Sequence, residues 1–198
     1  MQSQQYIDLI KNIISPEDNT GRFHKENIKY VIDLVYSQML TQFSEDVIKN
    51  IDHFSKEYAS QTVTLDGTSG LYYTDIPTPV VSIPTVASGI RYINTDNGMA
   101  LDFVPTTERE QYYMDGLTTQ LVDTNIGWWV KGDKIWYNES MTSTIAASGV
   151  RLVVIPMFSG FDATDTVNVP GGRSQELVER VLALIAPTAP VDIKSNNA

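Results

Sequence analysis

The spacing of apolar residues along the chain changes once, near residue 60. Before that point apolar residues recur at intervals of three and four positions, the spacing of one face of an α-helix. Three such stripes follow one another, over residues 3–14, 24–43 and 44–58. They predict an N-terminal helical unit over residues 1–57 whose outer faces are polar.

From residue 61 onward apolar and polar residues alternate, which is the pattern of a β-strand with one buried face. Turns that contain glycine or proline separate the short alternating segments, and Asn97-Gly98 is a strong hairpin signal. The run 150–155 is rich in β-branched residues and predicts a central strand, whereas the small residues of 140–149 predict a loop. Helical spacing returns over residues 174–186 and ends at a proline.

These elements predict an α+β protein with an N-terminal helical unit, an antiparallel β-sandwich or barrel-like core and a C-terminal helix. The predicted organisation is a helical unit over residues 1–57, a β-rich core with the C-terminal helix over residues 58–187, and an extended tail over residues 188–198. A chain of 198 residues is long enough to bury such a core without disulfides.

The aromatic centre of the predicted β core is Ile126–Asn138, which holds all three tryptophans. It predicts two strands joined by a turn at Lys131–Lys134. Because neighbouring side chains of a strand point to opposite faces, Trp128 and Trp129 should lie on opposite faces, with at least one ring exposed. An exposed tryptophan is more often part of a protein–protein interface than of a ligand site.

Two further segments would suit contacts with neighbouring molecules: residues 106–123, which fit either a short helix or a surface loop, and the extended tail over residues 191–198. Together with the hairpin they provide the candidate interface residues, which are Trp128, Trp129, Tyr112, Tyr113, Val191 and Ile193.

Composition limits the classes of function. The formal net charge of -10 repels nucleic-acid backbone and anionic lipid, and so argues against general DNA binding but not against a passage through which DNA slides. The chain has no cysteine, which excludes disulfides and thiolate metal sites. We see no signal peptide and no apolar run of the ~18 residues that a membrane span requires, so no membrane association is expected.

No set of residues predicts catalysis, a metal or a cofactor. His24 and His53 have no partner at ligand spacing, and no serine lies in a nucleophile elbow. Gly171-Gly172 before a helix is explained by a strand-to-helix turn, because the lysine of a phosphate-binding loop is absent. Asp162 and Asp165 are explained by turn preference. We therefore expect no catalytic, metal-binding or cofactor-binding residues.

Short aromatic and proline-containing segments also occur in a definite order between the helical unit and the C-terminal helix. They are Tyr-Tyr-Thr-Asp-Ile-Pro (72–77), Ile83-Pro84, Gly89-Ile90-Arg91, Phe103-Val104-Pro105, the hairpin at 129–137, Ile155-Pro156 and Val169-Pro170. This layout, from about Tyr6 to Ala186, resembles the small ring proteins of the head-to-tail connector of short-tailed phages, particularly of the crAss-like type.

The resemblance implies a structural virion protein that forms a ring, expected to be a dodecamer, below the portal. It implies that the ring links the portal to the tail and lines the passage for DNA ejection, without specific DNA binding. The implied partners are further copies of the chain, the portal protein and neighbouring tail or ring proteins. The implied location is the virion connector, after synthesis in the host cytoplasm. The resemblance carries over no catalytic residue.

Two other functions stay open at this point. One is a carbohydrate-binding β-sandwich that uses an exposed tryptophan. The other is a hydrolase with an unrecognised site, which ranks last because both histidines lie on predicted helices and no acid–base pair is evident.

Overall fold

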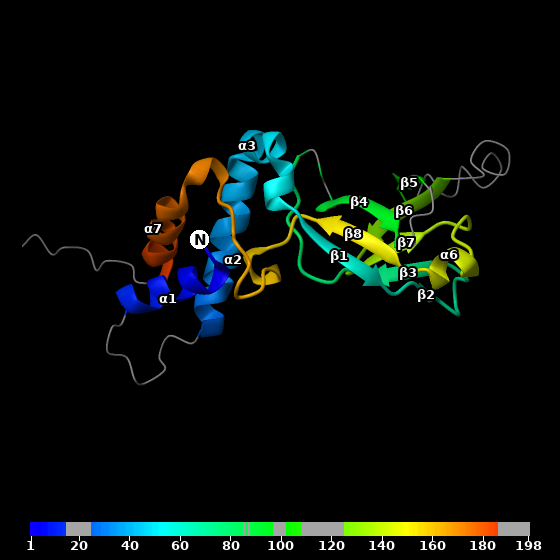
Figure 1. The fold of residues 1–198 in the computed structure, drawn as a ribbon, viewed down its shortest axis with the longest axis horizontal. Coiled ribbons are helices and arrows are strands. Elements are labelled where there is room, and N and C mark those ends of the chain that lie inside the picture. The colour runs from blue at the N-terminus through cyan, green and yellow to red at the C-terminus, as the bar shows by residue number, and fades with distance from the viewer. Residues whose placement is uncertain (15–24, 85, 87, 97–101, 108–124, 186–198) are drawn as a thin grey trace, which may run out of the picture. The chain divides into compact units, whose positions relative to one another are not determined.

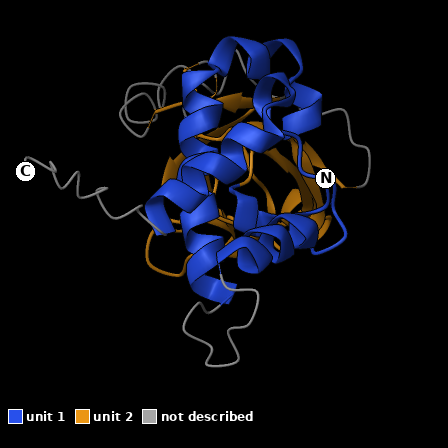
Figure 2. Ribbon diagram, turned by 90° about the vertical axis from the view of Figure 1, so that its left-hand side faces the viewer, with its two compact units in different colours: residues 1–54, 157–198 blue, residues 55–156 orange. Residues whose placement is uncertain are grey.

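The computed structural model describes residues 1–14, 25–84, 86, 88–96, 102–107 and 125–185 (Figure 1). It combines helices with two β-sheets and confirms the predicted α+β class. The chain divides into two compact units (Figure 2). Unit 1 comprises residues 1–54 and 157–198, and unit 2 comprises residues 55–156.

Helices that come from both ends of the sequence form unit 1. The helices are α1 (Ser3–Ile14), α2 (Lys25–Gln42), α3 (Ser44–Lys49) and α7 (Ser174–Ile185), with 3-10 turns η1 (Ile51–Phe54), η2 (Phe158–Gly160) and η3 (Pro170–Gly172). Helix α7 packs against α1 and α2, whereas the predicted organisation grouped it with the β core over residues 58–187. The spacing of apolar residues shows that α7 buries one face, but not which element covers that face.

The predicted third helix, over residues 44–58, is shorter in the structure. Helix α3 ends at Lys49, η1 follows, and then comes strand β1 (Lys56–Gln61). Lys56 pairs with Val154 of strand β8 (Val150–Val154). Strand pairing with a distant segment therefore overrides the local helical spacing at the end of this stretch.

Three aromatic side chains form the centre of unit 1. Tyr6 of α1, Tyr36 of α2 and Phe158 of η2 are fully buried. Phe158 meets both tyrosines edge to face, with its ring centroid 5.9 Å from that of Tyr6 and 6.3 Å from that of Tyr36. The Tyr6 hydroxyl donates to Ser174 Oγ at 2.7 Å, and the Tyr36 hydroxyl donates to the Asn168 carbonyl at 3.2 Å. Burial raises the pKa of Tyr36, so this hydroxyl remains a donor at neutral pH.

The first sheet of unit 2 is antiparallel, with strand order β1-β8-β4. Its strands are β1 (Lys56–Gln61), β8 (Val150–Val154) and β4 (Ile90–Thr95). Strand β8 lies in the middle, which confirms the predicted central strand, and all of its residues except Arg151 are buried.

The second sheet has the strand order β2-β3-β7-β6-β5. Its strands are β2 (Thr64–Leu65), β3 (Tyr72–Asp75), β7 (Lys134–Tyr137), β6 (Asn125–Lys131) and β5 (Asp102–Pro105). The pairs are antiparallel, except that β5 and β6 run parallel. The hairpin predicted at Asn97-Gly98 is wrong in its pairing, because β4 and β5 belong to different sheets. A parallel pair needs a connection of a dozen or more residues, and residues 106–124 separate these two strands.

Both sheets contribute to one cluster of buried side chains. The cluster includes Leu152 and Val154 of the first sheet and Trp128, Ile135 and Tyr137 of the second. The two sheets of unit 2 therefore bury their inner faces together, as in a sandwich.

The predicted tryptophan hairpin is confirmed as strands β6 and β7. Lys131 pairs with Lys134, so Gly132 and Asp133 form a two-residue turn. Gly132 has a φ of +67°, the left-handed region that such tight turns require at their first central position.

Residues 140–149, predicted as a loop, contain the short helix α6 (Ser143–Ala147). Its cap explains the difference: the Thr142 side chain accepts a hydrogen bond from the Ile145 N–H and so starts the turn. In the described parts of the chain, no helix is both long and apolar enough to cross a bilayer.

Candidate functional site on the tryptophan hairpin

Trp128 and Trp129 are both buried, with only 4% and 8% of their surfaces exposed. Trp128 belongs to the cluster between the sheets, whereas Trp129 does not, as the alternation of strand β6 predicts. The expectation that one of these rings is exposed is therefore wrong. Trp129 stands directly opposite Trp136, and Trp136 stands opposite Tyr73, so neighbouring strands bring aromatic rings together on the outer face.

The outer aromatic row is partly covered by its own neighbours. The Tyr73 and Trp136 ring centroids are 5.3 Å apart, with a tilt of 42°. Lys134 Nζ lies 3.8 Å from the Tyr73 ring centroid and 3.9 Å from Asp75 Oδ1. The ammonium group occupies one face of the Tyr73 ring, so that face is not free to stack against a sugar.

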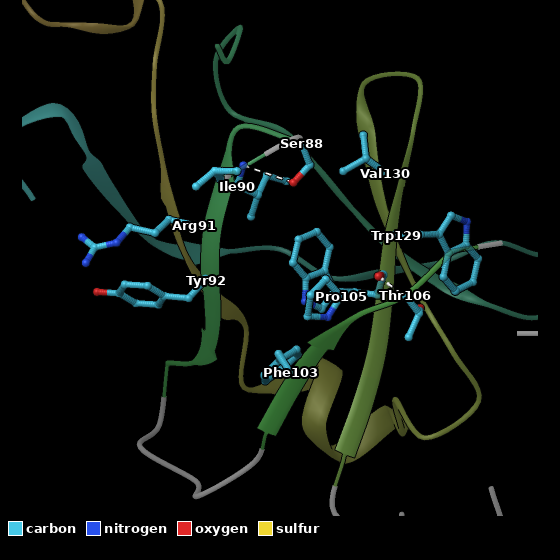
Figure 3. Close-up of a pocket in the computed structure, with 11 residues that line it drawn as sticks. Ser88, Ile90, Arg91, Tyr92, Phe103, Pro105, Thr106, Trp129 and Val130 are labelled. Atoms are coloured by element: carbon cyan, nitrogen blue, oxygen red, sulfur yellow. Dashed lines mark hydrogen bonds between the residues drawn. The ribbon is translucent and has the colours of Figure 1, made fainter. Parts of the chain in front are cut away.

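A cleft of about 360 Å³ lies beside the hairpin, between β4 on one side and β5 and β6 on the other (Figure 3). Its walls are largely apolar, with Val86, Ile90, Phe103, Pro105, Trp128 and Val130. Among the described residues that line it, Arg91 is the charged one, and its guanidinium lies 5.5 Å from the Tyr92 ring centroid. Figure 3 shows both of these side chains extending from β4 on the side away from β6.

Edge strands border this cleft. Among the described strands, β4 and β5 each end their sheet, and each pairs with one neighbouring strand. A register shift between Ile90 and Tyr92 marks a bulge in β4, and β5 ends with Pro105. Bulges and prolines at edges prevent uncontrolled strand addition, so the cleft is suited to apolar side chains rather than to an added strand.

Polar groups in and around the cleft are mostly used within the protein. Ser88 Oγ accepts from the Ile90 N–H at 3.4 Å, and Thr106 Oγ1 donates to the Trp128 carbonyl at 3.2 Å. The indole N–H groups of Trp128 and Trp129 are buried and have no hydrogen-bond partner among the described residues. The cleft thus offers largely apolar walls, and the described residues that line it include no acid–base pair.

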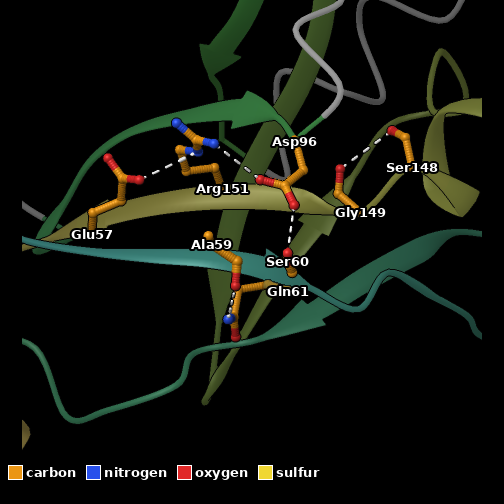
Figure 4. A network of polar contacts seen from close by, with 8 residues as sticks. All are labelled: Glu57, Ala59, Ser60, Gln61, Asp96, Ser148, Gly149 and Arg151. Atoms are coloured by element: carbon orange, nitrogen blue, oxygen red, sulfur yellow. Dashed lines mark hydrogen bonds and ion pairs between the residues drawn. The ribbon is translucent and has the colours of Figure 1, made fainter.

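Arg151 of β8 lies between two carboxylates on the first sheet (Figure 4). Its Nη2 is 3.3 Å from Asp96 Oδ1, and its Nε is 3.4 Å from Glu57 Oε1, an ion pair that lacks the geometry of a hydrogen bond. Ser60, with a φ of +53° at the bulge of β1, donates its hydroxyl to Asp96 Oδ2. The network links residues of β1 and β8 to Asp96, which follows β4, and so supports the sheet.

Asp96→Asn is expected to destabilise the protein above about pH 4 and to have a smaller effect below that pH. The Ser60 hydroxyl first, and the Arg151 guanidinium after it, hold the pKa of Asp96 below its usual value. The carboxylate therefore contributes its full stability above its unfolded-state pKa of about 3.9. That contribution is lost as the pH falls through the lower folded-state pKa. Urea unfolding at several pH values measures the free energy of unfolding of the wild-type protein and of the Asp96→Asn variant. If the difference between the two free energies stays constant well below pH ~4, the role assigned to Asp96 is contradicted.

The other predicted site residues are distributed as follows. Tyr112, Tyr113, Val191, Ile193 and His24 lie outside the described residues. His53 lies in η1, and the described residues contain no group of three or more acidic or histidine side chains placed to hold a metal ion.

The loop residues considered for chemistry form turns. The Asp162 N–H donates to Asp165 Oδ2 at 2.8 Å, and Gly171 and Gly172 adopt positive φ values of 61° and 69° at η3. Both segments are turns, as predicted, but within the described range 125–185 no strand directly precedes the glycines, because Thr166 forms only an isolated bridge with Gln2. The cleft and the Tyr73–Trp136 pair were missed by the sequence analysis. Alternation along each strand shows which residues share a face with Tyr73 or with Trp136. It does not give the register in which β3 pairs with β7, and that register brings the two rings together.

No protein-family model matches the chain, and no curated protein matches it. The functional proposal therefore depends on the layout of the sequence and on the surfaces described above.

Proposed function

We propose that this chain is a structural virion protein that forms a ring in the head-to-tail connector of a short-tailed phage. The observation that carries the proposal is the order of segments from Tyr6 to Ala186, which is similar to that of connector ring proteins of crAss-like phages. In this proposal the ring is a dodecamer below the portal, which it links to the tail. The protein acts by its shape and by its contacts with neighbours.

Large apolar side chains on the surfaces of both units support a role in assembly. They include Leu9, Ile13, Tyr30, Leu34, Ile48 and Leu184 in unit 1, and Leu65, Tyr92 and Val104 in unit 2. Single exposed apolar residues are ordinary, but those that border a groove mark surfaces that bind other proteins. Leu34 lines a groove in unit 1, and Tyr92 lines the cleft in unit 2.

The acidic balance of the chain suits a passage for DNA. At a net charge of -10, a ring of many copies repels phosphate groups, so packaged DNA slides through without binding.

A carbohydrate-binding function has weaker support. It depended on an exposed ring at Trp128 or Trp129, and both rings are buried. The partly buried Trp136 lies beside Tyr73, and Lys134 covers one face of that tyrosine ring.

The test is assembly on the portal protein of the same phage. Electron micrographs of portal particles mixed with this protein are expected to show one added ring below the portal, and the protein is expected in purified virions by mass spectrometry. Portal particles without this protein are the control. A protein that remains monomeric beside unchanged portal particles, and that is absent from virions, would contradict the proposal.

A further inference from the structure

Unit 2 is one uninterrupted stretch of the chain, residues 55–156, inserted between the two parts of unit 1. The chain therefore passes between the units twice, at the peptide bonds Phe54–Ser55 and Pro156–Met157. Both passages adjoin neighbouring strands of the first sheet, because Lys56 at the start of β1 pairs with Val154 at the end of β8. Paired residues of an antiparallel sheet have Cα atoms about 5 Å apart. The two units are thus linked by two chain segments that leave unit 2 side by side.

In the first passage, Ser55 lies between residues that are held within one unit each. On the side of unit 1, Phe54 is buried, and the His53 carbonyl accepts a hydrogen bond from Asn168 Nδ2 at 2.8 Å. On the side of unit 2, Lys56 already belongs to strand β1 and its ladder with β8. Ser55 is therefore the residue at which the backbone leaves one packed body and enters the other.

Met157 has the same position in the second passage. On the side of unit 2, Ile155 forms two backbone hydrogen bonds, through its N–H and its carbonyl, at 2.9 and 2.8 Å. On the side of unit 1, Phe158 is fully buried, and the Ser159 N–H donates to Asp33 Oδ1 at 2.7 Å. The partly buried Met157 stands between these fixed points.

Packing between secondary-structure elements is concentrated inside the units. Among the described residues, every pair of elements with extensive contacts lies within one unit, for example α2 with α7 in unit 1 and β1 with β8 in unit 2. Each unit also has its own buried aromatic side chains, such as Tyr36 and Phe158 in unit 1 and Trp128 and Tyr137 in unit 2. Closely packed interiors are hardly compressible, so each unit has the properties of a rigid body.

We propose that Ser55 and Met157 form a two-stranded hinge, about which unit 2 moves as a rigid body relative to unit 1. Hinges between domains are a few residues at the ends of elements that absorb changes in φ and ψ, and both residues have this position. Two adjacent links allow bending about the line that joins them, but they restrict other rotations, which would stretch one of the links. The inference does not depend on the ring function, and in any assembly such a hinge lets the two units hold different neighbours.

Distances between pairs of spin labels on the full-length protein test the hinge. The chain has no cysteine of its own, so each label position is defined by an introduced cysteine. Lys11→Cys on α1 with Thr144→Cys on α6 reports the distance between the units, and both positions are exposed. The matched controls at exposed positions are Lys11→Cys with Lys49→Cys inside unit 1, and Thr64→Cys with Thr144→Cys inside unit 2. An excess of unlabelled wild-type protein restricts the measured distances to one chain.

The pair of labels on different units is expected to give a distance distribution several times wider than that of either control pair. A distribution between the units that is as narrow as the controls would overturn the hinge. Control distributions as wide as the one between the units would show that the units themselves deform, and would overturn the rigid-body motion.

Glycine substitutions test whether Ser55 and Met157 are the hinge residues. Ser55→Gly with Met157→Gly is expected to widen the distribution between the units further, because glycine has access to more of φ/ψ space, and to leave both control distributions unchanged. The matched variant is Thr62→Gly with Glu139→Gly, at exposed positions outside strands in unit 2, which is expected to change none of the distributions.

An equal effect of the two glycine pairs, or no widening by the first pair, would overturn the assignment of the hinge residues. Melting temperatures show that each labelled variant is folded at the temperature of measurement. If the partly buried Met157 cannot be replaced without loss of folding, Ser55→Gly alone decides, and a distribution between the units that it leaves unchanged would overturn the assignment of Ser55.

Discussion

Phe158→Ala is expected to lower the free energy of unfolding of unit 1 by about 3–5 kcal/mol. Phe158 is fully buried, and its ring meets Tyr6 and Tyr36 edge to face. Truncation removes these ring contacts and leaves a cavity between side chains from α1 and α2, and a packed aromatic pair contributes beyond its buried area.

The distribution of tryptophans makes the Phe158 experiment specific for unit 1. All three tryptophans lie in unit 2, while the long helices α1, α2 and α7 lie in unit 1. Urea unfolding followed by far-ultraviolet circular dichroism therefore reports mainly unit 1, and tryptophan fluorescence reports unit 2. The control is Leu184→Ala, which is expected to change stability by less than about 0.5 kcal/mol because Leu184 is exposed. Equal effects of the two substitutions on the circular-dichroism transition would contradict the packing described.

Gly89→Ala is expected to destabilise unit 2 by about 2–5 kcal/mol. Gly89 has a φ of +70°, a conformation that costs an L-residue about 1–2 kcal/mol. A Cβ atom at this position would also lie 2.8 Å from Val80 Cβ and Cγ2, and 3.0 Å from the Val81 carbonyl oxygen. Relief of that overlap requires movement of backbone, which adds about 1–3 kcal/mol.

Gly132→Ala is the matched control for Gly89→Ala. Gly132 has a nearly identical φ of +67°, but a Cβ atom there would have nothing within 4 Å. Gly132→Ala is expected to destabilise unit 2 only through the cost of a positive φ for an L-residue, about 1–2 kcal/mol. Tryptophan fluorescence during urea unfolding measures both variants. If the two glycines cost the same, the close approach of Val80 to Gly89 is not present in solution.

The candidate site was only partly accessible from the sequence. The strands of the tryptophan hairpin and its turn follow from local alternation and from Gly132, and both are present. The prediction that at least one of Trp128 and Trp129 is exposed was wrong, because burial on the outer face depends on neighbours in other strands, such as Trp136. The cleft depends on the distance between β4 and β5, which belong to different sheets and whose placement no local pattern encodes.

Local patterns in the sequence were sufficient for the helices α1, α2 and α7, the central strand β8 and the α+β class. These features depend on the spacing of apolar residues within a few turns or a few strand positions, which a single chain segment carries in full. Tertiary structure decided that α7 packs with the N-terminal helices, that β5 pairs in parallel with β6, and that residues 56–58 form a strand. Periodicity marks the face that a segment buries, whereas the partner that covers that face is chosen by packing across the whole chain.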